Sequence, residues 1–271
     1  MKSRQEKKEI KVKDRRMARP QIFHVEDVKK TVTVQPIEIL KIGDCEVSFP
    51  TPNNVALFSS IASKQLQQAI NIHASLFGGK LKKSRIIEVK DDDVPRLFNY
   101  LECIQSSVVA IYTAIESFCN IAIPENYSLT VKNQKGVTEI WDKAAVERWH
   151  KTSDKISTIL PEIFKSKSPK DLIFWADFKN LETIRNDIVH QKTIKKTTET
   201  EVDARFLKKL LDPAVFNVIR SGFEIIKFFC EKDTSHAYFP MGFCEVQLKP
   251  IVIDSWQGNF ELIRASGAAD A

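Results

Sequence analysis

The chain of 271 residues lacks the long apolar runs that a membrane-spanning helix requires. A span needs roughly 18 to 20 uninterrupted apolar residues. The most apolar region, residues 107–123, is interrupted by Glu116 and Asn120 and is followed by Pro124. The charged N-terminus also lacks the apolar segment of a secretory signal. We therefore expect an intracellular, cytoplasmic protein with no membrane partner.

Paired cysteines and clustered histidines are missing as well. The five cysteines are widely spaced, form no C-x-x-C motif and include three that lie in apolar helical patterns. The five histidines are equally dispersed. Cysteines in this arrangement are typical of reduced thiols that pack as small hydrophobic groups, and a zinc site would need a ligand cluster. Gly78 and Gly79 precede lysine but lack the spacing of a phosphate-binding loop. We predict neither a metal nor a cofactor.

The net charge of +6 is located almost wholly at the N-terminus. Residues 1–19 hold nine basic and three acidic side chains, and the rest of the chain holds 32 of each sign. Such a tail can add salt-sensitive affinity for phosphate backbones. It can equally be a solvated arm that aids solubility. We assign residues 1–24 to a basic, flexible tail and leave both roles open.

Helical periodicity dominates what is present. Residues 25–50 alternate between apolar and polar positions around Gly43-Asp44, which predicts a β-hairpin. A first helix is expected after Pro52 and as far as Phe77, before two glycines. A second is expected from about Asp93 until Pro124. Its apolar residues recur at spacings of three and four, which indicates a buried face: Leu97, Leu101, Ile104, Val108, Ile111, Ile115 and Phe118.

Further helices are expected in the second half of the chain. A polar excursion over residues 125–140 includes a short predicted strand at 128–131, and a third helix is predicted over residues 143–160. Ser168 and Pro169 are typical of a helix start, so the fourth helix is predicted from there to His190. A short helix over residues 203–211 and a final apolar helix as far as Phe229 follow.

The expected fold is therefore mainly α. A helical bundle over residues 51–232 carries a small peripheral β element from the N- and C-terminal segments. Residues 233–271 form a C-terminal extension, weakly alternating over 238–256, that we predict to be partly strand and to pair with the N-terminal hairpin.

The fourth helix carries an arginine on its apolar face. Its core positions run Phe174, Phe178, Leu181, Arg185 and Ile188. A guanidinium in such a place is costly unless it meets an anion, a carboxylate or an interface. Asn186 follows it directly, and His190 lies five residues later at the expected helix end. If His190 leaves regular helical geometry, the two side chains can converge on one cleft.

This stretch, residues 181–190 (LETIRNDIVH), resembles the active-site motif of HEPN domains. That motif is an arginine, a polar residue and, after four to six intervening positions, a histidine in a late helix of a small helical bundle. The resemblance covers residues 54–231. It implies a HEPN-like bundle and a metal-independent endoribonuclease, with RNA as substrate and Arg185, Asn186 and His190 as catalytic residues.

The residue types suit this chemistry. Histidine can take or give a proton near neutral pH, and arginine stays charged while its planar fork binds phosphoryl oxygens. The resemblance implies that His190 acts as general base or acid, that Arg185 stabilises the transition state and that Asn186 positions the phosphate or the imidazole. The products would carry 2′,3′-cyclic phosphate and 5′-hydroxyl ends. It also implies a homodimer with a composite active site, acting as a toxin or antiviral-defence effector with an antitoxin or effector-complex partner.

The spacing alone has little specificity, because residues 19–24 also begin with arginine and end with histidine outside any helical pattern. A structural interpretation stays open: Arg185 pairs with Glu182 or Glu116, and His190 is favoured at a helix C-terminus by the helix dipole. Two further alternatives are a non-catalytic HEPN-like module for RNA or nucleotide binding or partner assembly, and a regulatory subunit of a separate enzyme.

Several other residues are weaker candidates. Glu116 and Asn120, one turn apart, are expected either to support the cleft by orienting Arg185 or to satisfy each other or a buried backbone group. Aromatic side chains can stack RNA bases but are more typical of a core or an interface; these are Trp141, Trp149, Trp175 and His150.

Basic loops can guide an RNA backbone, although charge runs are usually only solvated. The candidates are Lys192, Lys195 and Lys196, together with the loop at residues 80–85.

Overall fold

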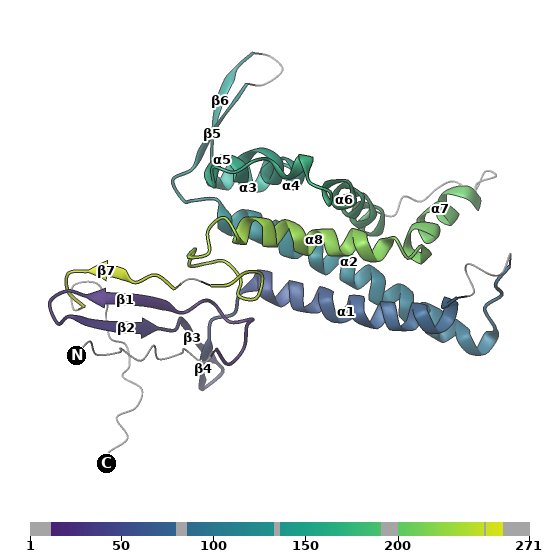
Figure 1. Ribbon diagram of the computed structural model, residues 1–271, viewed down its shortest axis with the longest axis horizontal. Coiled ribbons are helices and arrows are strands. Elements are labelled where there is room, and N and C mark those ends of the chain that lie inside the picture. The colour runs from purple at the N-terminus through teal and green to yellow at the C-terminus, as the bar shows by residue number, and fades with distance from the viewer. Residues whose placement is uncertain (1–11, 80–85, 133–135, 191–199, 247, 257–271) are drawn as a thin grey trace, which may run out of the picture.

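The computed structural model describes residues 12–79, 86–132, 136–190, 200–246 and 248–256, and it is mainly α-helical with small β elements (Figure 1). Four helices build the main body: α1 (Asn54–Phe77), α2 (Val94–Ala122), α6 (Trp175–Val189) and α8 (Val215–Cys230). The helix α2 is central, because it packs against each of the other three. The predicted mainly α fold class with peripheral strands is confirmed at this level.

Local signals set the ends of the two longest helices. The Asn53 side chain caps α1 by accepting from the Ala56 N–H at 3.0 Å, and the Gly78 N–H donates to the Ala74 carbonyl at the other end. The short 3₁₀ turn η1 (Asp91–Asp93) leads into α2, and Ile123, in extended conformation before Pro124, ends it. The predicted extents of both helices are confirmed.

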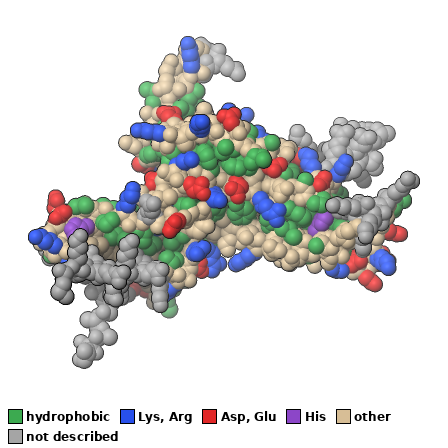
Figure 2. Space-filling view, in the orientation of Figure 1, with side chains coloured by type: hydrophobic (Ala, Val, Ile, Leu, Met, Phe, Trp, Pro, Cys, Tyr) green, Lys and Arg blue, Asp and Glu red, His purple; other side chains and the backbone are tan. Residues whose placement is uncertain are grey.

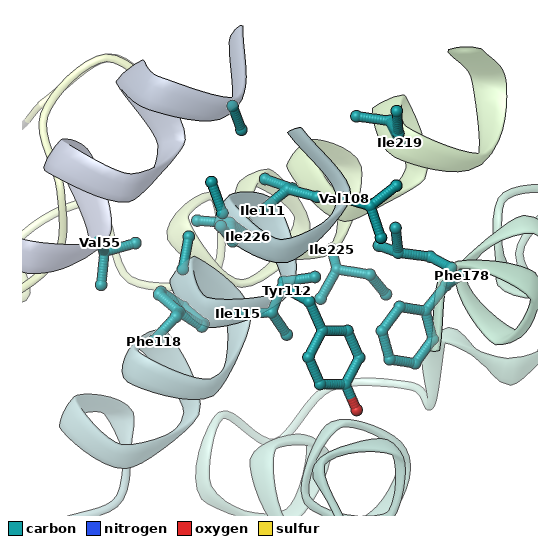
Figure 3. Close-up of a cluster of buried hydrophobic side chains, with 14 of the residues drawn as sticks. Val55, Val108, Ile111, Tyr112, Ile115, Phe118, Phe178, Ile219, Ile225 and Ile226 are labelled. Atoms are coloured by element: carbon teal, nitrogen blue, oxygen red, sulfur yellow. The ribbon is translucent and has the colours of Figure 1, made fainter. Parts of the chain in front are cut away.

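One face of α2 forms the centre of the hydrophobic core. Val108, Ile111, Ile115 and Phe118 are fully buried there among side chains of α1, α6 and α8 (Figure 3). The helices pack closely at Gly222 on α8, where an added Cβ would lie 2.5 Å from a side-chain carbon of Ile111. A side chain larger than hydrogen therefore fits at this crossing only if its neighbours shift.

The prediction of one continuous helix over residues 143–160 is wrong. Residues 143–160 divide into α3 (Lys143–Trp149), α4 (Thr152–Asp154) and the π-helical turn η2 (Lys155–Ile159), which leads into α5 (Leu160–Ile163). The break lies at His150, whose backbone is extended. It frees the Glu147 carbonyl, which accepts a hydrogen bond from Lys155 Nζ at 2.8 Å. A side-chain contact between residues eight positions apart thus replaces helical bonding.

The fourth predicted helix begins later than expected. Ser168 and Pro169 start the 3₁₀ turn η3 (Pro169–Asp171) rather than a long helix, and Leu172 in extended conformation ends it. The helix α6 then starts at Trp175 and ends at Val189. Phe178, Leu181 and Ile184 are its buried residues, so the predicted apolar face is present.

A short helix precedes α8 as expected and begins three residues early. This helix, α7 (Thr200–Leu211), ends against α1 and α2. The buried Tyr100 hydroxyl of α2 donates to the Leu210 carbonyl, and His73 Nε2 of α1 lies 3.0 Å from the Leu211 carbonyl oxygen. These contacts satisfy carbonyls at the helix end that have no partner within the helix.

Three small β units surround the helices. Strands β3 (Ile37–Ile42) and β4 (Cys45–Pro50) form the predicted hairpin, with Ile42 opposite Cys45 and Gly43 at a φ of 60° in the turn. A second hairpin, β5 (Ser128–Lys132) with β6 (Thr138–Asp142), projects away from the helices (Figure 1). It contains the predicted strand at 128–131 and a partner strand that the sequence analysis did not identify.

The third unit joins the two ends of the described chain. Strand β1 (Gln21–Val25) pairs antiparallel with β2 (Lys30–Val34) and parallel with β7 (Ile251–Ile253). The predicted strand at 238–256 is therefore much shorter, and its partner is β1 instead of the β3–β4 hairpin. Much of the preceding segment folds into turns, and the side chain of Phe239 within it is buried in the core.

The region assigned to a basic tail contributes to the fold from residue 16 onward, where the Arg16 carbonyl accepts from the Asn53 N–H at 2.8 Å. The backbones of Met17 and Pro52 pair in a β-bridge, and Arg19 is only 2% exposed. The Arg19 guanidinium donates to the Thr234 carbonyl at 2.8 Å. Part of the charge counted in the tail is thus buried against the segment that follows α8 and does not belong to a solvated arm.

Candidate functional site

A polar row on α2 lies opposite the core face of the same helix. Tyr112, Glu116 and Asn120 follow one another at intervals of four residues, so one side of the helix presents them together. The ring of Tyr112 is buried, whereas its hydroxyl oxygen points out of the apolar cluster (Figure 3). The predicted common direction of Glu116 and Asn120 is confirmed, since both line the same groove.

Arg185 lies on α6 against this row. Its Nη2 is 3.5 Å from Glu116 Oε1, and its Nη1 donates to Asn186 Oδ1 at 3.1 Å. The guanidinium carbon sits 4.9 Å from the centre of the Tyr112 ring, in cation–π geometry. The Arg185 side chain remains 26% exposed. The structural interpretation expected Arg185 to pair with Glu182 or Glu116, and the structure shows the pair with Glu116.

Glu182 has other partners. Its carboxylate accepts from the Tyr112 hydroxyl at 3.1 Å and pairs with Lys179 one turn earlier on α6. Burial and the negative charge of Glu182 raise the pKa of the Tyr112 hydroxyl, so this hydroxyl stays protonated as a donor. Tyr112 therefore connects α2 to α6 through its hydroxyl, and its ring provides the face on which the Arg185 guanidinium lies.

Tyr112, Glu116 and Glu182 line a polar groove between α2, α6 and the broken segment from α3 to η2, whereas Arg185 is not among its lining residues. The groove has a volume of about 720 Å³, within the usual range for small-molecule sites. Both signs of charge are represented in its lining, and basic and acidic side chains are also interspersed over the face in Figure 2. Asn186, the second residue of the HEPN-like motif, lines the groove directly.

Lys155 is the most buried charged residue of the groove. The residue is 4% exposed, and its ammonium donates to Asn120 Oδ1 at 3.2 Å and to the Glu147 carbonyl at 2.8 Å. Desolvation lowers the pKa of this lysine, while the more distant carboxylates of Glu147 and Glu116 act in the opposite direction. Asn120 is thus occupied by a lysine, and not by Glu116 as one interpretation expected.

Sequence reasoning did not identify Lys155 or Tyr112. Lys155 belongs to a π turn, where the extra residue per turn changes which positions face inward, so 3.6-residue periodicity does not detect it. Tyr112 is adjacent to Ile111 in the apolar stripe. The polar row at positions 112, 116 and 120 was the available signal for it.

His190 lies in a different environment. It is the C-cap of α6, with φ of −115° and ψ of 52°, so it leaves helical geometry as expected. The residue is exposed, and it is not among the residues that line the groove. Within the described part of the chain, no hydrogen bond or ion pair joins it to Arg185. Its neighbour Asp187 pairs with Lys209 of α7 at 2.9 Å.

The aromatic candidates divide between core and groove. Trp175 packs on Phe178, with 5.2 Å between ring centres, in the manner of a core residue. Trp141 is partly buried and donates to Glu139. Trp149 and His150 line the groove, and Trp149 is 64% exposed with Arg148 lying 4.7 Å from its ring centre. Of these four candidates, Trp149 and His150 are the two placed to contact a ligand in the groove.

The remaining predictions concern basic loops, metals and membranes. Lys192, Lys195, Lys196 and the loop at residues 80–85 lie outside the described residues. All five cysteines are free thiols. Among the residues that the structure describes, no group of three or more His, Cys, Asp or Glu side chains is close enough to hold a metal ion. No helix in the same part of the chain has the length and apolarity needed to cross a bilayer.

Comparison of the chain with protein-family models, with curated proteins and with solved structures gave no match. The resemblance to HEPN domains therefore stays a prediction based on residues 181–190 and on the helical architecture around them.

Proposed function

We propose that this protein is a HEPN-like, metal-independent endoribonuclease in which Arg185, Asn186 and His190 carry the chemistry. Supporting the proposal is a mainly helical body in which the motif occupies the end of a late helix packed on a long central one. The proposed substrate is RNA, and the proposed products are 2′,3′-cyclic phosphate and 5′-hydroxyl ends.

The placement of Arg185 is the observation that carries the proposal. An arginine has five N–H donors, and its described hydrogen bond and ion pair use one on Nη1 and one on Nη2. Glu116 and the Tyr112 ring hold the guanidinium from one side, and the side chain keeps a solvent-exposed edge. A pre-positioned cation with free donors is suited to bind the charge that develops on phosphoryl oxygens. Glu116 then orients Arg185, as one interpretation of the sequence expected.

The reaction would proceed by internal attack. His190 takes the proton of a ribose 2′-hydroxyl, the 2′-oxygen forms a bond to the adjacent phosphorus, and the bond from phosphorus to the 5′-oxygen breaks. The leaving 5′-oxygen takes up a proton from water to become a hydroxyl, and His190 then releases its own proton to the solvent. Arg185 donates to the non-bridging oxygens during this step, and Asn186 positions the phosphate from the groove edge.

The exposure of His190 fits a site completed by a second copy of the chain. Because an imidazole at the surface of one protomer is free to meet the arginine of another, we propose a homodimer with a composite active site. Toxin or antiviral-defence roles in the cytoplasm, with an antitoxin or effector-complex partner, follow from the HEPN resemblance and are part of the same proposal.

The test is incubation of purified protein with total RNA in EDTA. The parent protein should cut RNA and leave cyclic phosphate ends, and an Arg185→Ala, His190→Ala double variant should be slower by at least about 100-fold, because both proton transfer and charge stabilisation are lost. A double variant with Arg220→Ala and His24→Ala is the matched control, since both residues lie outside α6 and the groove. Equal cleavage by the parent and the Arg185, His190 variant would refute the proposal.

A non-catalytic RNA- or nucleotide-binding module is the second candidate. The ion pair between Arg185 and Glu116 and the separate surroundings of His190 favour it, because both are compatible with purely structural roles. Expression in a host cell separates the two candidates. A nuclease should be toxic unless Arg185 or His190 is replaced, whereas a binding module should be tolerated in both forms.

A further inference from the structure

The charges that line the groove are not equally compensated. Glu116 faces Arg185, and Glu182 pairs with Lys179. Lys155, by contrast, has only neutral hydrogen-bond partners among the described residues, a side-chain amide and a backbone carbonyl. A buried ammonium without a carboxylate at contact distance favours an anion as its third partner.

The geometry leaves Lys155 one donor for that partner. An ammonium has three N–H groups, and the contacts with Asn120 and Glu147 use two. Lys155 lines the groove and is 4% exposed, so a ligand could reach its remaining N–H only from inside the groove. Such a ligand would bring its negatively charged oxygen to the junction of α2 and η2.

A flat apolar surface lies in the same lining. Trp149 is 64% exposed, which is unusual for a tryptophan, and the Arg148 guanidinium lies over one face of its ring in cation–π contact. Base stacking on exposed aromatic rings is the common mode of sequence-tolerant nucleotide recognition. The Asn186 amide, from α6, adds a hydrogen-bonding group on the opposite wall.

We infer that the groove between α2, α6 and the segment from α3 to η2 is a binding site for one nucleotide, with its base on Trp149 and its phosphate on Lys155. The same chemistry has two sources, a free nucleotide or one nucleotide of an RNA chain. The inference goes beyond the proposed cleavage, because binding here requires neither His190 nor a reacting 2′-hydroxyl. In the RNA case it adds a subsite beside the proposed scissile linkage and rests on the proposed function.

Calorimetric titration of the full chain tests the inference with two probes. One is a set of free nucleotides, 5′-AMP, 5′-GMP, 5′-CMP and 5′-UMP, and the other is a 2′-O-methyl oligoribonucleotide, which cannot be cut by internal attack. Binding of a monophosphate would identify a free nucleotide as the source, and binding of the oligonucleotide alone would identify RNA. Inorganic phosphate serves as the comparison for the contribution of the base.

Two variants assign the binding to the groove. Trp149→Ala should weaken binding at least about tenfold, the order expected for losing one stacked base. Lys155→Met removes the charge with little change in volume and should weaken binding to a similar extent. Phe98→Ala is the matched control, because Phe98 is 58% exposed and is not part of the groove lining. Its affinity should stay within about twofold of the parent, as for a surface change away from the ligand.

Three results would overturn the inference: neither probe binds, inorganic phosphate binds as tightly as the nucleotides, or a folded Trp149→Ala variant binds as the parent does. Because Trp149 is exposed, its replacement decides the matter even if Lys155→Met fails to fold. Binding without any RNA cleavage would refute the proposed nuclease and leave this inference intact. Cleavage that is insensitive to Trp149→Ala, with no binding of either probe, would do the reverse.

Discussion

Along α6, the surroundings of Arg185 and of His190 differ in kind. Arg185 is held by Glu116, Asn186 and the Tyr112 ring, all within one chain. His190 caps the same helix with its side chain at the surface. One half of the proposed motif is thus built by intramolecular packing, and the other half is presented outward. Under the proposed function, a single chain would organise the phosphate-binding half, and a second chain would complete the site.

The largest effect should come from mixing two inactive variants. If Arg185 of one protomer acts with His190 of the other, a dimer of one Arg185→Ala chain and one His190→Ala chain contains one intact site. Random exchange of equal amounts should then restore about a quarter of the parent cleavage rate, because half of the dimers are mixed and each has one of two sites intact. The assay is RNA cleavage after unfolding and refolding the two variants together.

The control is each variant refolded with itself, which should stay inactive. No recovery in the mixture, when both variants are shown to form mixed dimers, would mean that Arg185 and His190 act within one chain. The difference between the surroundings of Arg185 and those of His190 would then play no part in catalysis.

A second prediction concerns the packing that holds Arg185 in place. Gly222→Ala should lower the free energy of unfolding by about 1–3 kcal/mol, because the added methyl group collides with Ile111 and crowds Leu181 where α8 crosses α2 and α6. Urea denaturation measures the change. Asn217→Ala, on the exposed side of α8, should change it by no more than about 0.5 kcal/mol. A Gly222→Ala protein as stable as the parent would show that the helices can separate freely at this crossing.

The smallest effect is expected at Glu116. Glu116→Gln keeps the shape of the side chain but removes the charge that faces Arg185 at 3.5 Å. Because both side chains are partly exposed, stability should change by at most about 1 kcal/mol. Cleavage should slow by about tenfold, since a less fixed guanidinium stabilises the transition state less well. Glu125→Gln, at a 92% exposed side chain that pairs with Lys143, is the matched control. An unchanged cleavage rate in Glu116→Gln would remove Glu116 from the site.

Sequence analysis predicted the elements whose signals are local. The first two helices have their turn and proline signals at both ends, and the β3–β4 hairpin has Gly43 at a positive φ. The parallel pairing of β1 with β7 was not predicted, because the two strands lie far apart in the sequence. The break at His150 was not predicted, because periodicity does not show that the Lys155 side chain bonds to the Glu147 carbonyl. Periodicity describes a single element, and it cannot show which distant group replaces a helical hydrogen bond.

The same distinction applies to the candidate site. The i, i+4 spacing of Glu116 and Asn120 predicted their common direction, and the place of Arg185 in an apolar stripe predicted that it would need a partner. Lys155 and Trp149 could not be assigned to the groove beforehand, because their positions follow from the break between α3 and η2. The local sequence pattern indicated the HEPN-like motif at residues 181–190, whereas the groove beside it became visible only in the tertiary structure.

The π turn η2 has a consequence for how this chain can vary. Each π turn contains one residue more than an α turn would, so losing one residue from Lys155–Ile159 would turn it into ordinary helix and rotate everything before it by about 100°. Such a deletion would preserve composition and hydrophobicity almost unchanged while swinging the lysine out of the groove. Among homologous chains, the presence of that single extra residue is therefore a more sensitive marker of the groove than the identity of any one side chain.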